Sequence, residues 1–124
     1  MPDVLVDTSP FQYLFQLGLL DLLPRLYGHV TIPDGVAFEL AQGRAIGIAL
    51  PDPTTLPWVT IRVPRSDSRL VLDLGRGERE LLCLALEFKE PLLVVDDALA
   101  RRYAHAMGLR KTGTLGVLVK GKSA

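Results

Sequence analysis

Two short apolar runs that end in acid constrain this chain more than any other feature. The run LLVV at 92–95 is followed by Asp96 and Asp97, and the run VLV at 4–6 is followed by Asp7. Continuous apolar runs of this length are typical of strands buried on both faces of a parallel sheet. In open α/β sheets, ligands bind outside the carboxyl ends of such strands. We therefore expect the two strands to be neighbours and to direct Asp7 and Asp96 into one crevice.

The rest of the chain predicts strands and helices in alternation. Strands are predicted at 3–7, 29–32, 58–63, 92–95 and 109–111, where the sequence is apolar or alternates. Helices are predicted from Pro10 to Gly18 and at 19–27, 36–42, 78–89, 98–107 and 115–119, where apolar residues recur at helical spacing. This order predicts one α/β domain over residues 1–124, a three-layer α/β/α sandwich with a mainly parallel sheet.

Polar residues and glycines indicate where helices begin and where loops lie. Ser9 is expected to cap the first helix and Asp97 the helix that follows the 92–95 strand. The segment 112–114 (TGT) is expected to cap the last helix. Residues 43–50 are ambiguous between a loop and a frayed continuation of the preceding helix, and 64–74 predict a linker with one helical turn.

Composition limits the classes of function. Lys+Arg and Asp+Glu both number 14, so net charge supplies no long-range attraction to nucleic acid or membrane, although a local basic patch remains open. Cys83 is the only cysteine, which excludes an intrachain disulfide and a thiolate metal cluster. The amino terminus lacks the basic region of a signal peptide, and no apolar run approaches the roughly 18 residues of a membrane span. We expect a cytoplasmic protein that does not associate with membranes.

Two glutamates are placed to join the aspartates at the strand ends. Glu78 begins a predicted helix on the side of Leu81, Leu82 and Ala85, which should face the sheet. Glu39 lies on the helix predicted after the second strand. Three or four carboxylates in one crevice raise one another's pKa, so such a cluster is costly unless a cation neutralises it.

An all-carboxylate cluster predicts a hard metal ion. Oxygen ligands favour Mg²⁺ or Mn²⁺ over zinc, and metal ions held in this way suit phosphodiester hydrolysis. Each acid alone also has an ordinary interpretation. Asp7 could be a turn or cap residue, Glu39 a solvated charge, and Glu78 a charge at a helix start, worth about 0.3–1 kcal/mol. The convergence of all of them on one edge of one sheet is what favours a functional site.

The ordered set of motifs resembles the PIN-domain ribonuclease family. The segments that carry this resemblance are 4–9 (VLVDTS), Glu39, 77–82 (GERELL) and 92–96 (LLVVD). Two further segments, 96–101 (DDALAR) and 112–116 (TGTLG), resemble its prokaryotic, VapC-toxin-like branch. The resemblance covers nearly the whole chain. The chain departs from many members by having Glu78 where they have aspartate, and by a short, proline-rich 43–74 where toxin relatives often have a helical clip.

The resemblance implies an endonuclease that cleaves RNA with Mg²⁺ or Mn²⁺, built on a sheet of strand order 3-2-1-4-5. The implied catalytic residues, which are also the metal ligands, are Asp7, Glu39, Glu78 and Asp96. Auxiliary residues are Ser9 and Thr112, which could bind a metal water or phosphate, and Asp97, a rival to Asp96 that we expect to cap a helix. The toxin-like motifs also imply a small antitoxin protein as a partner.

Cations gather in the last quarter of the chain. They are Arg101, Arg102, Arg110, Lys111, Lys120 and Lys122. They form either a solvated surface with cations near helix ends or a patch that follows RNA phosphates. The candidates for RNA binding are Arg101, Arg102, Arg110 and Lys111. Because 48% of the residues are hydrophobic, a large share for a chain of this size, we also expect a homodimer face.

Two other functions remain open from the sequence. A phosphoryl-accepting receiver domain is also α/β with an acidic pocket, but it places paired acids after the first strand and the accepting aspartate mid-chain, whereas here the pair comes late. A non-catalytic binding module with the same fold predicts weak or no Mn²⁺ binding.

Overall fold

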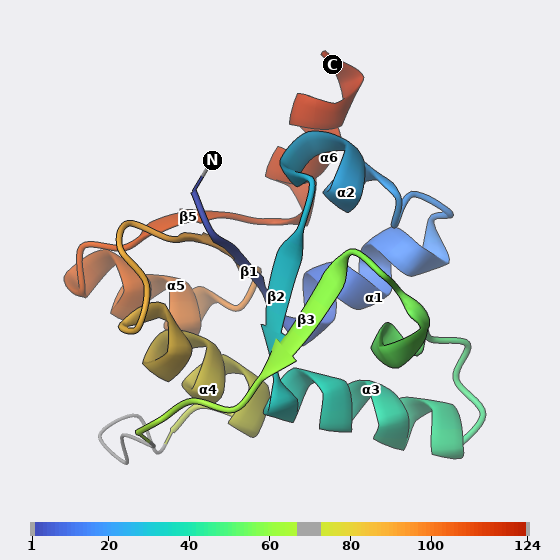
Figure 1. The fold of residues 1–124 in the computed structure, drawn as a ribbon, viewed down its shortest axis with the longest axis horizontal. Coiled ribbons are helices and arrows are strands. Elements are labelled where there is room, and N and C mark those ends of the chain that lie inside the picture. Colours follow the sequence, from blue (N-terminus) through green and yellow to red (C-terminus); the bar gives the residue numbers. More distant parts are fainter. Residues whose placement is uncertain (1, 67–72, 124) are drawn as a thin grey trace.

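Five parallel strands form the centre of the computed structural model, which describes residues 2–66 and 73–123 (Figure 1). In chain order they are β1 (Val4–Val6), β2 (Val30–Pro33), β3 (Val59–Arg62), β4 (Leu92–Val94) and β5 (Arg110–Thr112). Their order in the sheet is β3-β2-β1-β4-β5, which confirms the predicted order. β3 and β5 are the two edges of this sheet.

The strands β1 and β4 lie side by side, as predicted. Val4 pairs with Leu92 and Val6 with Val94, so the two strands end level with each other. Beyond the strand ends, the backbone N–H of Asp7 donates to the carbonyl oxygen of Val94 at 3.0 Å. The residues that follow β1 and β4 therefore leave the sheet side by side, at the carboxyl ends of the two strands.

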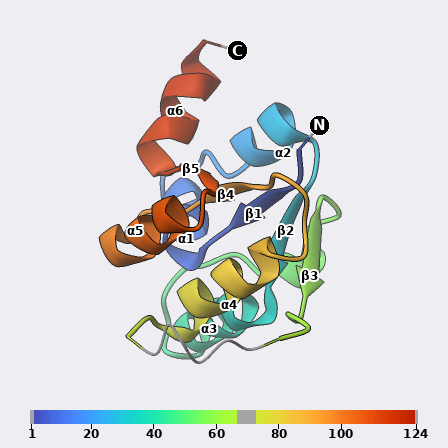
Figure 2. The ribbon, with the colours of Figure 1, turned by 90° about the vertical axis from the view of Figure 1, so that its left-hand side faces the viewer.

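Helices cover both faces of the sheet, which confirms the three-layer prediction (Figures 1 and 2). They are α1 (Thr8–Gln16), α2 (Leu22–Tyr27), α3 (Asp34–Ala45), α4 (Arg76–Ala85), α5 (Ala98–Ala106) and α6 (Thr114–Lys122), with a short 3-10 turn, η1 (Pro53–Thr55). Figure 1 shows α4 and α5 together on the left of the sheet and α1 on its right. In the described ranges, no helix has both the length and the apolar composition that crossing a membrane requires.

Alternate side chains of the central strands enter two different cores. Val4 and Val6 belong to the core that contains Phe11 of α1, whereas Leu5 belongs to the core that contains Leu81 of α4. All of these side chains are at most 2% exposed. Because the central strands are buried on both faces, their sequences are apolar throughout instead of alternating.

The first and fourth helices begin and end at residues other than those predicted. α1 starts at Thr8, with Asp7 and not Ser9 at the N-cap position. α4 is Arg76–Ala85 instead of 78–89, with Gly75 at its N-cap. After Ala85 the N–H groups of residues 86–88 bond three residues back instead of four, and the chain leaves the helix before Pro91, which cannot continue it.

Other boundaries shift by a few residues. α3 continues to Ala45, so the ambiguous segment 43–50 is partly helix. α6 continues past Val119 to Lys122, and the two lysines of its last turn stabilise the negative end of the helix dipole. The last strand is Arg110–Thr112 instead of 109–111. The predicted linker 64–74 falls partly on 67–72, which lies outside the described residues.

Candidate metal and catalytic site

Asp7 lies at the junction of β1 and α1, and one oxygen of its buried carboxylate has no hydrogen-bond partner. The residue occupies the N-cap position of α1 but makes no capping hydrogen bond with its side chain. It is 1% exposed, and its Oδ1 atom has no hydrogen-bond partner. An unpartnered carboxylate oxygen in the interior costs free energy. A capping role therefore does not explain Asp7.

Burial and neighbouring charges raise the pKa of Asp7 to about 7, from 3.8 for an ordinary aspartate. Loss of solvent around the charged form is the largest cause, and the negative charge of Glu78 is the next. Glu39 and Asp97 raise the pKa further, while the backbone of Thr8 opposes the rise. Four carboxyl groups from four segments of the chain therefore act on one another at this edge of the sheet.

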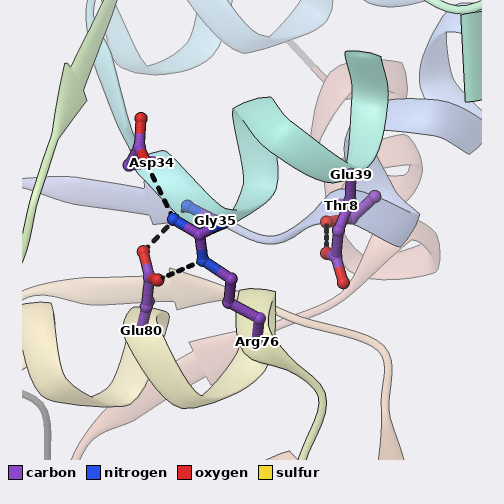
Figure 3. Close-up of polar contacts among 6 residues, drawn as sticks. All are labelled: Thr8, Asp34, Gly35, Glu39, Arg76 and Glu80. Atoms are coloured by element: carbon purple, nitrogen blue, oxygen red, sulfur yellow. Dashed lines mark hydrogen bonds and ion pairs between the residues drawn. The ribbon is translucent and has the colours of Figure 1, made fainter. Parts of the chain in front are cut away.

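Glu39 reaches the same region from α3. The hydroxyl of Thr8 donates to Glu39 Oε1 at 2.5 Å, so the residue directly after Asp7 fixes the Glu39 side chain (Figure 3). Gly77 of α4 faces this pair: a Cβ there would overlap Glu39 Oε1 and lie 3.1 Å from Thr8 Oγ1. Glycine thus lets α4 approach the pair closely. Thr8 was not among the predicted site residues, although a hydroxyl residue directly after a strand-end acid was a usable signal.

Glu78 lies in the first turn of α4. Its side chain folds back over Gly75, where a Cβ would lie 3.4 Å from Glu78 Oε1. Burial is the largest cause that raises the pKa of Glu78, and the charges of Glu39 and Asp97 raise it further, against the opposing effect of nearby backbone groups. In both Glu78 and Asp7, burial and neighbouring negative charges therefore destabilise the ionised carboxylate.

A hydrogen-bonded network joins the first turns of α3 and α4, the helices that carry the two glutamates (Figure 3). Arg76 donates to Asp34 Oδ2 at 2.9 Å and to Glu80 Oε2 at 2.7 Å, and the backbone N–H of Gly35 donates to Glu80 Oε1 at 2.8 Å. The Arg76 guanidinium also lies 5.0 Å from the centre of the Phe38 ring. These contacts fix the two helix starts relative to each other and so position Glu39 and Glu78.

The neighbouring residues Asp96 and Asp97 direct their carboxylates to different places. Asp97 caps α5 by accepting from the N–H of Ala100 at 2.9 Å, as predicted, and its charge also raises the pKa of Asp7 and of Glu78. Asp96 instead accepts from the N–H and the hydroxyl of Thr114, at 2.8 and 2.5 Å, at the start of α6.

Sequence reasoning preferred Asp96 because Asp97 was expected to be occupied as a cap. In the structure both residues cap a helix, so capping does not distinguish them. The cap on α5 uses Oδ2 of Asp97, and this does not prevent its charge from acting on the other acids. The charges of Glu39, Glu78 and Asp97 act on Asp7, and the Asp96 side chain hydrogen-bonds to the start of α6.

The remaining candidates are distributed around this cluster. Ser9 is half-buried in the first turn of α1, and Thr112 lines a cavity together with Asp96 and Arg101. Arg101 donates to the carbonyl oxygen of Val95 at 2.9 Å. The other cations predicted to bind RNA lie on β5 (Arg110 and Lys111) and on the exposed side of α5 (Arg102).

The donor set suits a hard divalent ion. Within residues 2–66 and 73–123, no three Asp, Glu, His or Cys side chains form a group that could chelate an ion as they stand. However, the unpartnered Oδ1 of buried Asp7 needs a positive partner, and the neighbouring groups that can help to hold one are carboxylates. Oxygen donors of this kind select Mg²⁺ or Mn²⁺. Asp7, Glu39, Glu78 and Asp97 are the residues that would hold it.

A PIN-domain family model matches residues 3–124. This chain belongs to the PIN-domain family. No curated protein and no solved structure matches it. PIN domains are generally nucleases and typically use divalent metal ions, which is the chemistry that the acidic cluster of this PIN domain suits.

The sheet of this PIN domain also excludes the receiver-domain alternative. Receiver domains have the strand order 2-1-3-4-5, with the first and third strands adjacent. Here β1 lies between β2 and β4, and β3 is at the edge. The acidic edge is therefore that of a PIN domain and not of a phosphoryl-accepting receiver.

Proposed function

We propose that this PIN domain is an endoribonuclease that hydrolyses RNA phosphodiester bonds with Mg²⁺ or Mn²⁺. The single observation that carries the proposal is the buried carboxylate of Asp7, whose Oδ1 has no partner and whose pKa is raised by burial and by the charges of Glu78, Glu39 and Asp97. Repulsion among these acids favours the binding of a divalent cation. A cation held there would polarise the phosphate and activate a water molecule.

The chain's own residues have separate tasks in this proposal. Asp7, Glu39, Glu78 and Asp97 supply oxygen ligands, and one of these carboxylates accepts a proton from the attacking water. Thr8 holds Glu39 through its hydroxyl, and the Arg76 network holds the two helix starts. Asp96, which the sequence favoured as a ligand, has in this proposal the task of capping α6.

The test combines metal binding with cleavage. Mn²⁺ titrated into the purified protein should release or absorb heat in a saturable isotherm, and a labelled RNA should be cut only when the metal is present. Asp7→Asn and Glu78→Gln should each abolish cleavage and weaken Mn²⁺ binding. Asp21→Asn, which removes an exposed carboxylate paired with Arg25, is the matched control and should behave like the parent. A parent chain that neither binds Mn²⁺ nor cuts RNA would instead be a non-catalytic binding module.

We also propose that a second protein covers part of this domain, either a small antitoxin or another copy of the chain. The toxin-like motifs suggest the first, and exposed apolar side chains support both. Leu115 and Val119 of α6 lie one turn apart and are 73% and 62% exposed. Light scattering on the purified chain, alone and after co-expression with the product of the neighbouring reading frame, distinguishes a homodimer, a heteromeric complex and a monomer. A monomer in both measurements would contradict the proposal.

A further inference from the structure

Two cavities adjoin beside the edge strand β5. The larger, of about 650 Å³, is lined by Asp96 and Gly113, and the smaller, of about 420 Å³, is lined by Pro2 and Arg110. Both cavities are also lined by Lys111 of β5 and Lys120 of α6, so they meet at these two side chains. We call the two together the β5 groove.

The β5 groove runs along β5, from the carboxyl ends of the strands, where the acidic residues lie, to their amino ends. Asp96 and Gly113 follow β4 and β5, so they mark the carboxyl ends of the strands. Pro2 precedes β1 and Arg110 begins β5, so they mark the amino ends. The backbone N–H of Asp7 donates to the carbonyl oxygen of Val94 at 3.0 Å, two residues before Asp96, so the groove begins at the strand ends where Asp7 lies.

Positive charge dominates the groove although the whole chain is neutral. The cations that line it are Arg101, Arg110, Lys111 and Lys120. Asp96 is the one carboxylate among the residues that line the two cavities. It already accepts two hydrogen bonds at the positive end of the α6 dipole, so its charge is partly compensated. The groove therefore attracts anions.

Two of these cations are held in place by the fold. The Arg101 guanidinium donates to the carbonyl oxygen of Val95 at the acidic end of the groove. The Lys120 ammonium lies 4.9 Å from the centre of the Tyr27 ring, between the two cavities. Cations fixed in this way lose less side-chain entropy when an anion binds than free surface lysines do.

We propose that the β5 groove binds the sugar-phosphate backbone of the RNA strand that is cut at the acidic cluster, on one side of the cleaved bond. This proposal rests on the proposed ribonuclease function. A cluster of four carboxylates repels a polyanion, so the strand needs positive charge beside the cluster to stay bound. The groove places that charge at the carboxyl ends of β4 and β5 and extends it along β5.

The test measures RNA binding without cleavage. A fluorescently labelled 20-nucleotide single-stranded RNA is titrated with protein in a chelator-containing buffer, and anisotropy is recorded over a range of salt concentrations. Lys111→Gln/Lys120→Gln should weaken binding about tenfold at low salt and reduce the slope of log Kd against log salt by about 1.4, because each lost phosphate contact on a single strand contributes about 0.7. Arg110→Gln/Lys120→Gln changes two exposed side chains and serves as a second variant.

The matched control is Arg65→Gln/Lys89→Gln, which removes the same charge from exposed cations that do not line the groove. It should bind like the parent. Equal weakening in the control and in both groove variants would show that total charge matters and would overturn the proposal. Displacement of the RNA by a polyglutamate peptide at equal charge concentration would also overturn it, in favour of an acidic protein partner.

The same variants separate this proposal from the proposed function. If the parent cuts RNA in Mn²⁺ but the groove variants bind RNA as tightly as the control, the groove proposal fails while the ribonuclease function stands. If the parent binds RNA through the groove but does not cut it, RNA binding by the groove stands and the ribonuclease function fails.

Discussion

Asp96 and Asp97 are identical neighbours in the sequence, and the structure gives them different surroundings. Each accepts a hydrogen bond from the start of a different helix, Asp96 from α6 and Asp97 from α5. The charge of Asp97 acts on Asp7 and Glu78, whereas the carboxylate of Asp96 lines the β5 groove. At the scale of single residues, two identical neighbours therefore have different hydrogen-bond partners, and only Asp97 is among the charges that raise the pKa of Asp7 and of Glu78.

The pair provides a controlled comparison, because asparagine retains a capping oxygen and removes only the charge. Asp97→Asn should reduce Mn²⁺-dependent cleavage by at least about 100-fold, since loss even of groups that only support a metal ligand costs 10–100-fold. Asp96→Asn should keep cleavage near the parent level and lower the free energy of unfolding by about 1 kcal/mol, through weaker hydrogen bonds to Thr114. Cleavage rates and urea unfolding of both variants measure this. The reverse pattern would restore Asp96 as the ligand.

At the scale of elements, the site depends on the close approach of α4 to α1 and α3. The Arg76 network sets the positions of the two helix starts, and Gly77 leaves space for Glu39 and Thr8 between them. A helix that carried a side chain at position 77 would have to displace Glu39 or stand further off.

Gly77→Ala should therefore weaken metal binding without unfolding the protein. Alanine favours a helix over glycine by about 1 kcal/mol, which offsets part of the cost of crowding. The added methyl group meets the flexible end of Glu39, so we expect Glu39 to move and Mn²⁺ affinity to fall by about tenfold.

Gly121→Ala is the matched control, because its added methyl group would lie 2.9 Å from Leu22, an apolar side chain that belongs to the hydrophobic core. It should change the melting temperature and leave Mn²⁺ affinity unchanged. Calorimetry and thermal unfolding of both variants provide the two readouts. An unchanged Mn²⁺ affinity in Gly77→Ala would show that Glu39 does not take part in binding the ion.

At the scale of the whole molecule, the buried acids lower the free energy of unfolding, whereas the two hydrophobic cores raise it. The pKa of Asp7 is about 7 in the folded chain against 3.8 for an exposed aspartate, so between these values the folded state holds a proton that the unfolded state releases. The free energy of unfolding of the metal-free protein should therefore fall as pH rises from about 4 to about 7, by up to about 4 kcal/mol from this group. The raised pKa of Glu78 acts in the same direction.

Urea unfolding in chelator at a series of pH values measures this dependence. In Asp7→Asn, the free energy of unfolding should change little over this pH range. In the control Asp21→Asn, it should fall as in the parent. Saturating Mn²⁺ should restore stability at pH 7 to the parent chain and less so to Asp7→Asn. A parent chain whose metal-free stability does not fall over this range would show that Asp7 is solvated in solution.

Much of the fold could be predicted because burial on both faces leaves a strong local pattern. The apolar runs before Asp7 and Asp96 predicted the adjacent strands β1 and β4, and the alternation of elements predicted the layers. Helix ends were predicted less well. At the end of α4, hydrogen bonds three residues back replace those four residues back, and α1 starts at Thr8 with Asp7 at its N-cap position. Such differences of one turn leave little trace in the hydrophobic pattern.

The sequence by itself determined the strands, their parallel arrangement and the presence of acids at their carboxyl ends, because these follow from hydrophobic periodicity over short distances. Only the tertiary structure decided that Asp96 bonds to the start of α6 and Asp97 to the start of α5, that Thr8 holds Glu39, and that Lys111 and Lys120 share a groove. Those outcomes depend on side-chain directions and on contacts between residues far apart in the chain. No local pattern encodes them, since they arise only when helices and strands pack against one another.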